Sequence, residues 1–220
     1  MAQIDSTKIQ KIFDYVYSPT SPLTKANGNL VFGRWDPLVA QRAGEIYKQG
    51  LVDYSMFVGG IGKDSGVLTQ LNLPEATWQA ALGNIFYGIP ANTIYTEPRP
   101  TNGGEAARMV IEDLVELESN KGLKHDGLII LIHPTASRRM RAIMDLTRDQ
   151  KGFNTSYQNA GSNYIFNSKN PVDQKEAVME LVKLADWPAK NWCAKQNDLP
   201  EDLVAYAKEV LPVVTTSDFC

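Results

Sequence analysis

Five consecutive apolar residues, Leu128-Ile-Ile-Leu-Ile132, limit the folds open to this chain. Apolar side chains at every position suit a strand that is covered on both faces, as in a parallel sheet between helices. Shorter apolar runs predict three further strands, at 29–32, 52–58 and 94–96. Amphipathic patterns with a period near 3.6 predict helices between and after them, at 36–50, 75–87, 102–117 and 135–146. We therefore expect an α/β fold with a Rossmann-like parallel sheet and helices on both faces.

The ends of the chain are less regular than this alternating part. Apolar positions from Ile4 to Val16 predict an N-terminal helix, which a turn-rich loop follows. After residue 150 the sequence is polar, and Tyr164-Ile-Phe166 is the run that best fits an edge strand. Two more helices are predicted, at 171–185 and 199–211. We divide the chain into 1–150, an α/β ligand-binding core with the N-terminal helix, and 151–220, a mainly helical C-terminal subdomain packed on that core.

Charge and composition exclude several classes of function. The net charge of -3 over 220 residues argues against a nucleic-acid-binding domain, which is usually basic. No stretch approaches the roughly 18 apolar residues that cross a bilayer, and no signal-peptide core is visible. Two cysteines and two histidines cannot form a Cys- or His-rich zinc site, and no motif requires another metal. We expect a cytoplasmic protein with a small-molecule partner, without nucleic acid or membrane, and of undetermined oligomeric state.

Polar and small residues follow every predicted strand. Ligands of open α/β sheets bind beyond the carboxyl ends of the strands, so these residues are the candidate site. Candidates for binding are Gly33, Arg34, Asp36, Gly59, Gly60, Gly62, Lys63, Thr101, Asn102, Thr135 and Arg138. Candidates for acid or base catalysis are Glu75, Glu105 and His133.

Several of these candidates have two interpretations. The glycine-rich loop from Gly59 to Gly66 matches neither the P-loop nor the dinucleotide-binding spacing. It either shapes a turn or exposes backbone N–H groups that hold an anion together with Lys63. Asn102 and Glu105 have the spacing of a helix capping box, a role compatible with ligand binding. His133 is either a buried hydrogen-bonding group or an acid or base.

Arg138 is the strongest single candidate from the sequence. It lies with Arg139 and Arg141 in the first turns of a predicted helix, where the helix dipole disfavours cations. An anionic ligand, or a buried carboxylate such as Glu75 or Glu105, would offset that cost. We expect Arg138 to hold a carboxylate or phosphate through paired hydrogen bonds.

Taken together, these segments resemble the YdcF-like family, a domain of unknown function that includes YdcF, SanA and ElyC. The resemblance covers roughly residues 29 to 148 and has fitting intervals. It rests on five segments in order: 33–50, the Gly-Gly loop 57–62, Glu75-Ala-Thr77 with Gly88-Ile-Pro90, Thr101-Asn-x-x-Glu105, and Pro134-Thr-Ala-Ser-Arg138. The chain departs from the family pattern at Pro98, Pro100, Ala106 and Thr135.

The resemblance implies a Rossmann-like sheet with a helical C-terminal part, and S-adenosylmethionine as a ligand. The departures put a shared catalytic activity in question more than they do the fold or the pocket. Three hypotheses stay open: a binding protein or enzyme for S-adenosylmethionine or a related nucleotide, a hydrolase or transferase for a phosphorylated substrate, and a regulatory module with a vestigial pocket.

Overall fold

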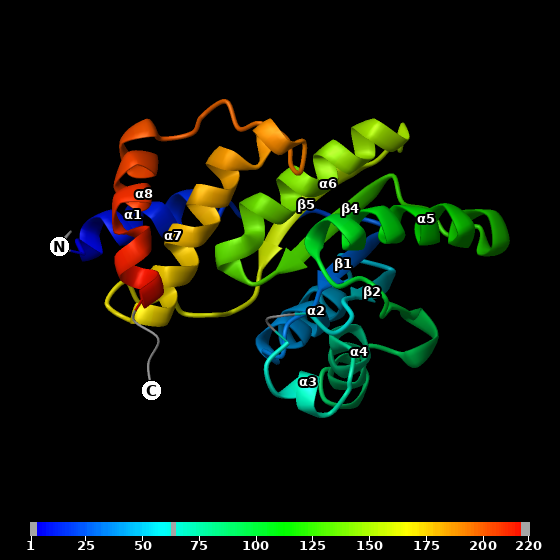
Figure 1. Ribbon diagram of the computed structural model, residues 1–220. Helices are drawn as coiled ribbons and strands as arrows, with labels where there is room; N and C mark the ends of the chain where they lie inside the picture. The colour runs from blue at the N-terminus through cyan, green and yellow to red at the C-terminus, as the bar shows by residue number, and fades with distance from the viewer. Residues whose placement is uncertain (1–3, 63–64, 217–220) are drawn as a thin grey trace.

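The structure, a computed structural model, describes residues 4–62 and 65–216. Its centre is a five-stranded sheet with the order β3-β2-β1-β4-β5 (Figure 1). The strands are β1 (Gly28–Phe32), β2 (Tyr54–Val58), β3 (Ile94–Glu97), β4 (Gly127–Ile132) and β5 (Ser156–Gly161). All neighbouring strands pair in parallel, which confirms the expected α/β Rossmann-like fold. The strand order reverses between β1 and β4, and in such sheets ligands bind at this point.

Helices cover both faces of the sheet. They are α2 (Leu38–Lys48), α4 (Glu75–Ile85), α5 (Gly103–Lys121) and α6 (Ser137–Lys151), and a short α3 (Val67–Gln70) precedes α4. Successive strand residues point to opposite faces. Val31 and Ile129 accordingly belong to the core under α2 and α4, whereas Leu30 and Ile130 belong to the core under α5 and α6. This double burial is the reason that β4 is apolar from Leu128 to Ile132 and that β1 and β2 are mostly apolar, with Asn29 and Ser55 as buried polar residues.

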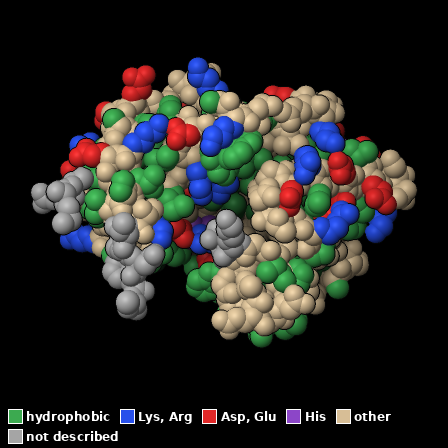
Figure 2. Space-filling model, viewed as in Figure 1, with side chains coloured by type: hydrophobic (Ala, Val, Ile, Leu, Met, Phe, Trp, Pro, Cys, Tyr) green, Lys and Arg blue, Asp and Glu red, His purple; other side chains and the backbone are tan. Residues whose placement is uncertain are grey.

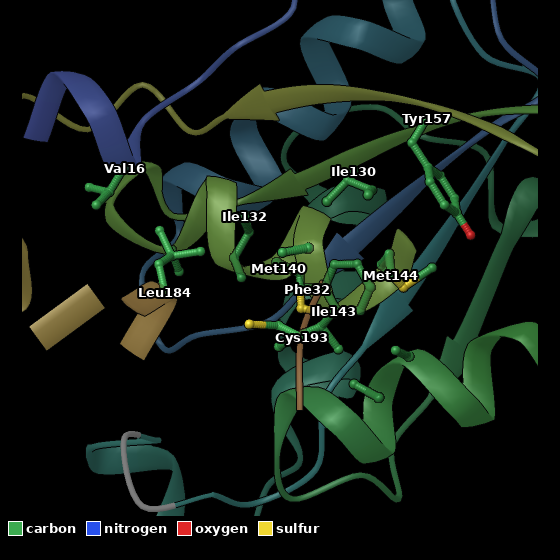
Figure 3. Packing of buried hydrophobic residues seen from close by; sticks show 14 of the residues in the cluster. Val16, Phe32, Ile130, Ile132, Met140, Ile143, Met144, Tyr157, Leu184 and Cys193 are labelled. Carbon is green, nitrogen blue, oxygen red and sulfur yellow. The ribbon is translucent and has the colours of Figure 1, made fainter. Parts of the chain in front are cut away.

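Three further helices lie together beside α6 (Figure 1). They are α1 (Ser6–Val16), α7 (Pro171–Asp186) and α8 (Glu201–Thr216). Val16 of α1 and Leu184 of α7 share one core cluster with Ile132 and Met140 (Figure 3). The helical group is thus built from both ends of the chain, and the sheet continues past the predicted boundary at residue 150.

The last strand is not where the apolar pattern placed it. The strand is β5, whereas Tyr164-Ile-Phe166 lies outside the sheet. The apolar run serves contacts outside the sheet. The Phe166 ring stacks on Phe13 with centroids 4.0 Å apart, and Tyr164 donates a hydrogen bond to Asp173. β5 escaped detection because its polar side chains bind another segment: the Gln158 amide nitrogen donates to the backbone oxygen of Thr24 at 3.0 Å.

The other predicted elements are present with small shifts at their ends. Helices predicted at 75–87, 102–117 and 135–146 begin within two residues of the predicted start, and α5 and α6 end four or five residues later than expected. Asp36 lies just before α2, whose N-cap residue is Pro37, and its Oδ1 accepts a hydrogen bond from the Leu38 amide at 2.9 Å. Within the described residues, no helix has the length and apolar character needed to cross a membrane.

Candidate functional site

A cleft of about 820 Å³ opens at the carboxyl edge of the sheet. Its walls come from the loops after β1, β2 and β4, the starts of α4, α5 and α6, and one face of α7. Figure 2 shows a hollow between the two halves of the molecule, with Lys and Arg side chains beside it. The sequence-predicted residues that line the cleft are Gly33, Arg34, Gly59, Gly60, Gly62, Glu75, Thr101, Asn102 and Thr135. The strand order places these separate loops at the switch point.

The remaining predicted residues are placed differently. Asp36, Glu105, His133 and Arg138 do not line the cleft. Lys63 lies outside the described residues. The four residues that do not line the cleft make hydrogen bonds with other parts of the protein.

Four glycine amides in the loops after β1 and β2 donate to acceptors within the protein. The Gly33 amide donates to the Val58 oxygen at 2.8 Å, and the Gly59 amide donates to the Glu97 oxygen at 2.9 Å. The Gly60 amide donates to the backbone oxygen of Pro100 at 2.7 Å, and the Gly62 amide donates to Ser65 Oγ at 2.7 Å. Internal acceptors thus already use these four amides, and Lys63, the other member of the expected anion cradle, lies outside the described residues.

The glycines instead make room for Glu75 at the floor of the cleft. A Cβ on Gly33 would lie 2.6 Å from Glu75 Cβ, and one on Gly59 would lie 3.0 Å from Glu75 Oε2. Gly59 also has a φ of +141°, which L side chains rarely adopt. The Ser65 hydroxyl donates to Glu75 Oε1 at 2.7 Å. A carboxylate is thereby fixed at the first residue of α4, against the ends of β1 and β2.

A second carboxylate, Glu176 of α7, joins three elements across the cleft. Arg34 donates through Nη2 to Glu176 Oε1 at 2.6 Å and through Nη1 to Oε2 at 3.2 Å. The Thr135 hydroxyl donates to Glu176 Oε2 at 3.1 Å. Burial by itself raises the pKa of Glu176, but the hydrogen bonds and charge of Arg34 outweigh it and hold that pKa below its ordinary value. Glu176 is thus ionised at neutral pH and ties α7 to the loops after β1 and β4.

His133 lies behind this network. Its side chain is 4% exposed, and its Nδ1 lies 2.8 Å from Thr135 Oγ1 and 3.6 Å from Glu176 Oε2. Desolvation, followed by the charge of Arg34, lowers the pKa of His133 to about 4, so the imidazole is neutral at pH 7. Because Thr135 donates to Glu176, the neutral ring donates from Nδ1 to Thr135. His133 therefore orients Thr135 and does not reach the cleft itself.

A third carboxylate at the cleft, Glu180, belongs to α7. The buried Glu180 accepts a hydrogen bond from Arg139 Nε, and its Oε1 lies 2.7 Å from Lys183 Nζ. Burial raises the pKa of Glu180, yet the charges of Arg139 and Lys183 outweigh it and keep the pKa below its ordinary value. One carboxylate therefore faces two cations, which leaves a net positive charge in this part of the cleft.

Arg138, which the sequence predicts to hold a carboxylate or phosphate, does not line the cleft. Its Nη1 donates to both oxygens of Asp198, at 3.0 and 2.9 Å, and its guanidinium lies 4.0 Å from the centroid of the Tyr15 ring. Neither Glu75 nor Glu105 is its partner. The carboxylate that offsets the unfavourable helix-dipole position is thus Asp198, sixty residues later in the chain, and the neighbouring Arg139 faces the cleft instead.

Glu105 lies in the first turn of α5, whose N-cap residue is Asn102. Its Oε2 accepts from the backbone N–H and the hydroxyl of Thr101, both at 2.9 Å. Its own amide donates to Asn102 Oδ1 at 3.0 Å. These bonds lower the pKa of Glu105, the backbone bond from Thr101 most of all. The capping interpretation is confirmed, and it fixes Asn102 and Thr101 at the cleft wall.

Sequence reasoning missed the contribution of α7. Lys175, Glu176, Met179, Glu180 and Lys183 all line the cleft. Their spacings of three and four residues place them on one face of the helix. The signal available in the sequence was a row of charged residues at that spacing beside the apolar stripe of the helix. Such a pattern does not indicate which part of the protein the charged face packs against.

Comparisons with known proteins do not indicate a function for this chain, so the function has to be inferred from the geometry of the cleft. No protein-family model matches the chain, and no curated protein shows significant sequence similarity to it. Within residues 4–62 and 65–216, no group of three or more His, Cys, Asp or Glu side chains has the arrangement of a metal site.

Proposed function

We propose that this chain binds a small nucleoside-like molecule with a charged end group in the cleft at the carboxyl edge of the sheet. The observation that carries the proposal is the position of the cleft. It lies at the point where the strand order reverses, between the loops after β1 and β4, which is where sheets of this order bind nucleotides. Its volume of about 820 Å³ is within the range of small-molecule sites.

The lining of the cleft suits a ligand with both polar and apolar parts. Among the described residues, Arg34, Arg139, Lys175 and Lys183 supply positive charge, and Glu75, Glu176 and Glu180 supply negative charge. Apolar surface comes from Ile132, Met140, Met179 and other side chains. An aromatic base would pack on the apolar wall, and ribose hydroxyls would donate hydrogen bonds to the fixed carboxylate of Glu75.

S-adenosylmethionine is one candidate of this chemical class. Its amino-acid carboxylate requires a cation, and its ammonium group requires an acceptor such as Glu75. The cleft contains both kinds of group, so the donor set fits. The resemblance to the YdcF-like family, which we keep as a proposal, supports the same ligand.

A second candidate function is acid or base catalysis on a phosphorylated substrate. The observation that favours it is Glu75, whose carboxylate is oriented by Ser65 in a cleft that also contains Arg139 and Lys183. A positioned carboxylate could accept a proton from an attacking hydroxyl, while the cations would stabilise phosphoryl charge. His133 is excluded from this step by its burial.

Thermal denaturation with a panel of compounds tests both candidates. The panel contains S-adenosylmethionine, S-adenosylhomocysteine, AMP, ADP and sugar phosphates. A compound at 100 times its Kd stabilises the folded chain by about 2.7 kcal/mol, which is easily seen as a rise in Tm. The variant Glu75→Gln keeps an acceptor for Ser65 but lacks the charge, and Glu116→Gln on the exposed side of α5 is its matched control.

We expect at least one nucleoside-containing compound to stabilise the chain, with weaker stabilisation of Glu75→Gln and unchanged stabilisation of Glu116→Gln. Turnover of a sugar phosphate that is lost in Glu75→Gln would favour the catalytic candidate. A chain that no member of the panel stabilises would contradict the proposal and favour a vestigial pocket.

A further inference from the structure

Arg139 has hydrogen-bonding capacity that the protein itself does not use. Its Nε donates to Glu180, and its guanidinium lies 5.2 Å from the centroid of the Trp187 ring. Among the described residues, its two terminal amino groups have no hydrogen-bond acceptor. The side chain is only 14% exposed, and it lines the cleft. Four N–H donors of a largely buried cation therefore face the ligand space.

The local charge around Arg139 is positive. Glu180 is shared with Lys183, whose Nζ lies 2.7 Å from Oε1, so two cations face one carboxylate. Low-dielectric surroundings make an uncompensated charge costly, because little water is present to solvate it. An anion placed against Arg139 would restore neutrality and satisfy the unused donors.

The start of α5 adds donors on the same side. Arg139 Nη1 lies 3.4 Å from the Cβ position of Gly103, the first residue of α5. The Asn102 side chain and backbone oxygens accept the amides of Glu105 and Ala106, so the capping bonds do not use the amides of Gly103 and Gly104. The first amides of a helix lack intrahelical acceptors and favour negative charge. The guanidinium therefore lies beside the first turn of α5.

Other cationic positions are less suited to the same task. Arg34 donates two hydrogen bonds to Glu176, and Arg138 pairs with Asp198 away from the cleft. The glycine amides after β1 and β2 are hydrogen-bonded internally. Within the part of the chain that the structure describes, Arg139 thus lines the cleft with terminal N–H groups that donate no hydrogen bond to the protein.

We propose that Arg139, with Lys183 and the start of α5, forms the subsite for the anionic end of the ligand, a phosphate or a carboxylate. The inference rests on the proposed function, because it assigns one end of the same cleft. It predicts that compounds with an anionic end are preferred over otherwise matched neutral ones. The nucleoside portion would then extend toward Glu75.

Matched ligand pairs and matched arginine variants test the subsite. Isothermal titration compares AMP with adenosine, S-adenosylmethionine with 5′-methylthioadenosine, and inorganic phosphate alone. The variant Arg139→Lys keeps the charge opposite Glu180 but loses the fork. Arg138→Lys, one residue earlier on α6, is the control. Each variant is first checked for an unchanged circular dichroism spectrum.

We expect AMP or S-adenosylmethionine to bind the parent chain at least about tenfold more tightly than its neutral counterpart, as loss of a charged hydrogen-bond set implies. Arg139→Lys should weaken that anionic ligand by about tenfold to a hundredfold and leave the neutral one unchanged. Arg138→Lys should bind both as the parent does. The pair with the larger dependence on Arg139 identifies phosphate or carboxylate as the preferred group.

Equal affinity for AMP and adenosine, and for the other pair, would overturn the subsite while leaving the proposed function intact. Binding of inorganic phosphate that depends on Arg139, without binding of any nucleoside, would support the subsite and overturn the nucleoside part of the proposed function. No binding of any probe would overturn both. If Arg139→Lys does not fold, Lys183→Gln decides the matter, with an expected loss of about fivefold for the anionic ligand; no loss would refute the subsite.

Discussion

Replacing His133 by Gln tests whether a neutral imidazole is buried behind the wall of the cleft. Glutamine is of similar size and can donate to Thr135 Oγ1, the atom that His133 Nδ1 contacts at 2.8 Å. It does not titrate. The groups that face His133 are Arg34, Glu176 and Glu180, together with the Tyr164 ring at 4.5 Å between centroids. The variant therefore keeps these surroundings and removes the proton-binding site.

The size of the effect follows from the pKa of His133 in the two states. It is about 4 in the folded chain, against an ordinary value of 6.5 in an unfolded one. Between these values the unfolded state binds more protons, so stability falls as the pH falls through 6.5 toward 4. The full difference corresponds to about 3 kcal/mol, of which about 2 kcal/mol is lost between pH 7 and pH 5.

Urea denaturation of the parent chain and of His133→Gln at pH 5, 6 and 7 measures this difference. The free energy of unfolding of the parent should fall by about 2 kcal/mol more than that of the variant between pH 7 and pH 5. Other titrating groups affect both chains and cancel in the comparison. Parallel pH dependences of the two chains would refute a buried neutral His133.

Two further predictions concern backbone packing and a carboxylate pair. Gly60→Ala places a Cβ 2.8 Å from the Pro100 oxygen and should lower the free energy of urea unfolding by about 1–3 kcal/mol. In the control Gly104→Ala, the atom nearest to the new Cβ is 3.5 Å away, so this variant should not be destabilised. Equal losses of unfolding free energy in the two variants would contradict the packing argument. Burial and the neighbouring Glu97 raise the pKa of Asp113 to about 7, so the folded chain loses stability as pH rises from 3.8 through 7. Asp113→Asn should be more stable than the parent at pH 8 by about 1 kcal/mol, allowing for partial exposure, and a parent as stable as the variant would contradict the raised pKa of Asp113.

The sheet was largely predictable because its three central strands, β1, β2 and β4, are buried on both faces. A run such as 128–132 leaves few alternatives, and the links between such strands meet at one edge by topology alone. β5 was not predictable in the same way. The side-chain amide of Asn159 donates to the backbone oxygen of Ser18 at 3.2 Å, and its polar character hides the strand. That contact joins residues 141 positions apart, which no local pattern records.

The candidate site was predictable in part for similar reasons. The loops after the strands meet at one edge of the sheet, and Gly33, Gly59 and Thr135 from these loops line the cleft, whereas His133, directly after β4, does not. Arg138 and Arg139 show the limit. Adjacent residues on a helix point about 100° apart, and only the positions of Asp198 and Glu180 decide which arginine faces the cleft. The face of α7 was missed because helix docking is a tertiary property.

An amide correlation spectrum titrated with AMP and with S-adenosylmethionine tests the central claim most directly. If either ligand binds in the cleft, shifts should concentrate on the amides of residues 33–34, 59–62, 101–104 and 135–139, and on the face of α7 between Lys175 and Lys183. The amides at the opposite edge of the sheet, such as Asp126 and Gly152, should stay unchanged. Shifts confined to that opposite edge, or no shifts with either ligand, would contradict the account.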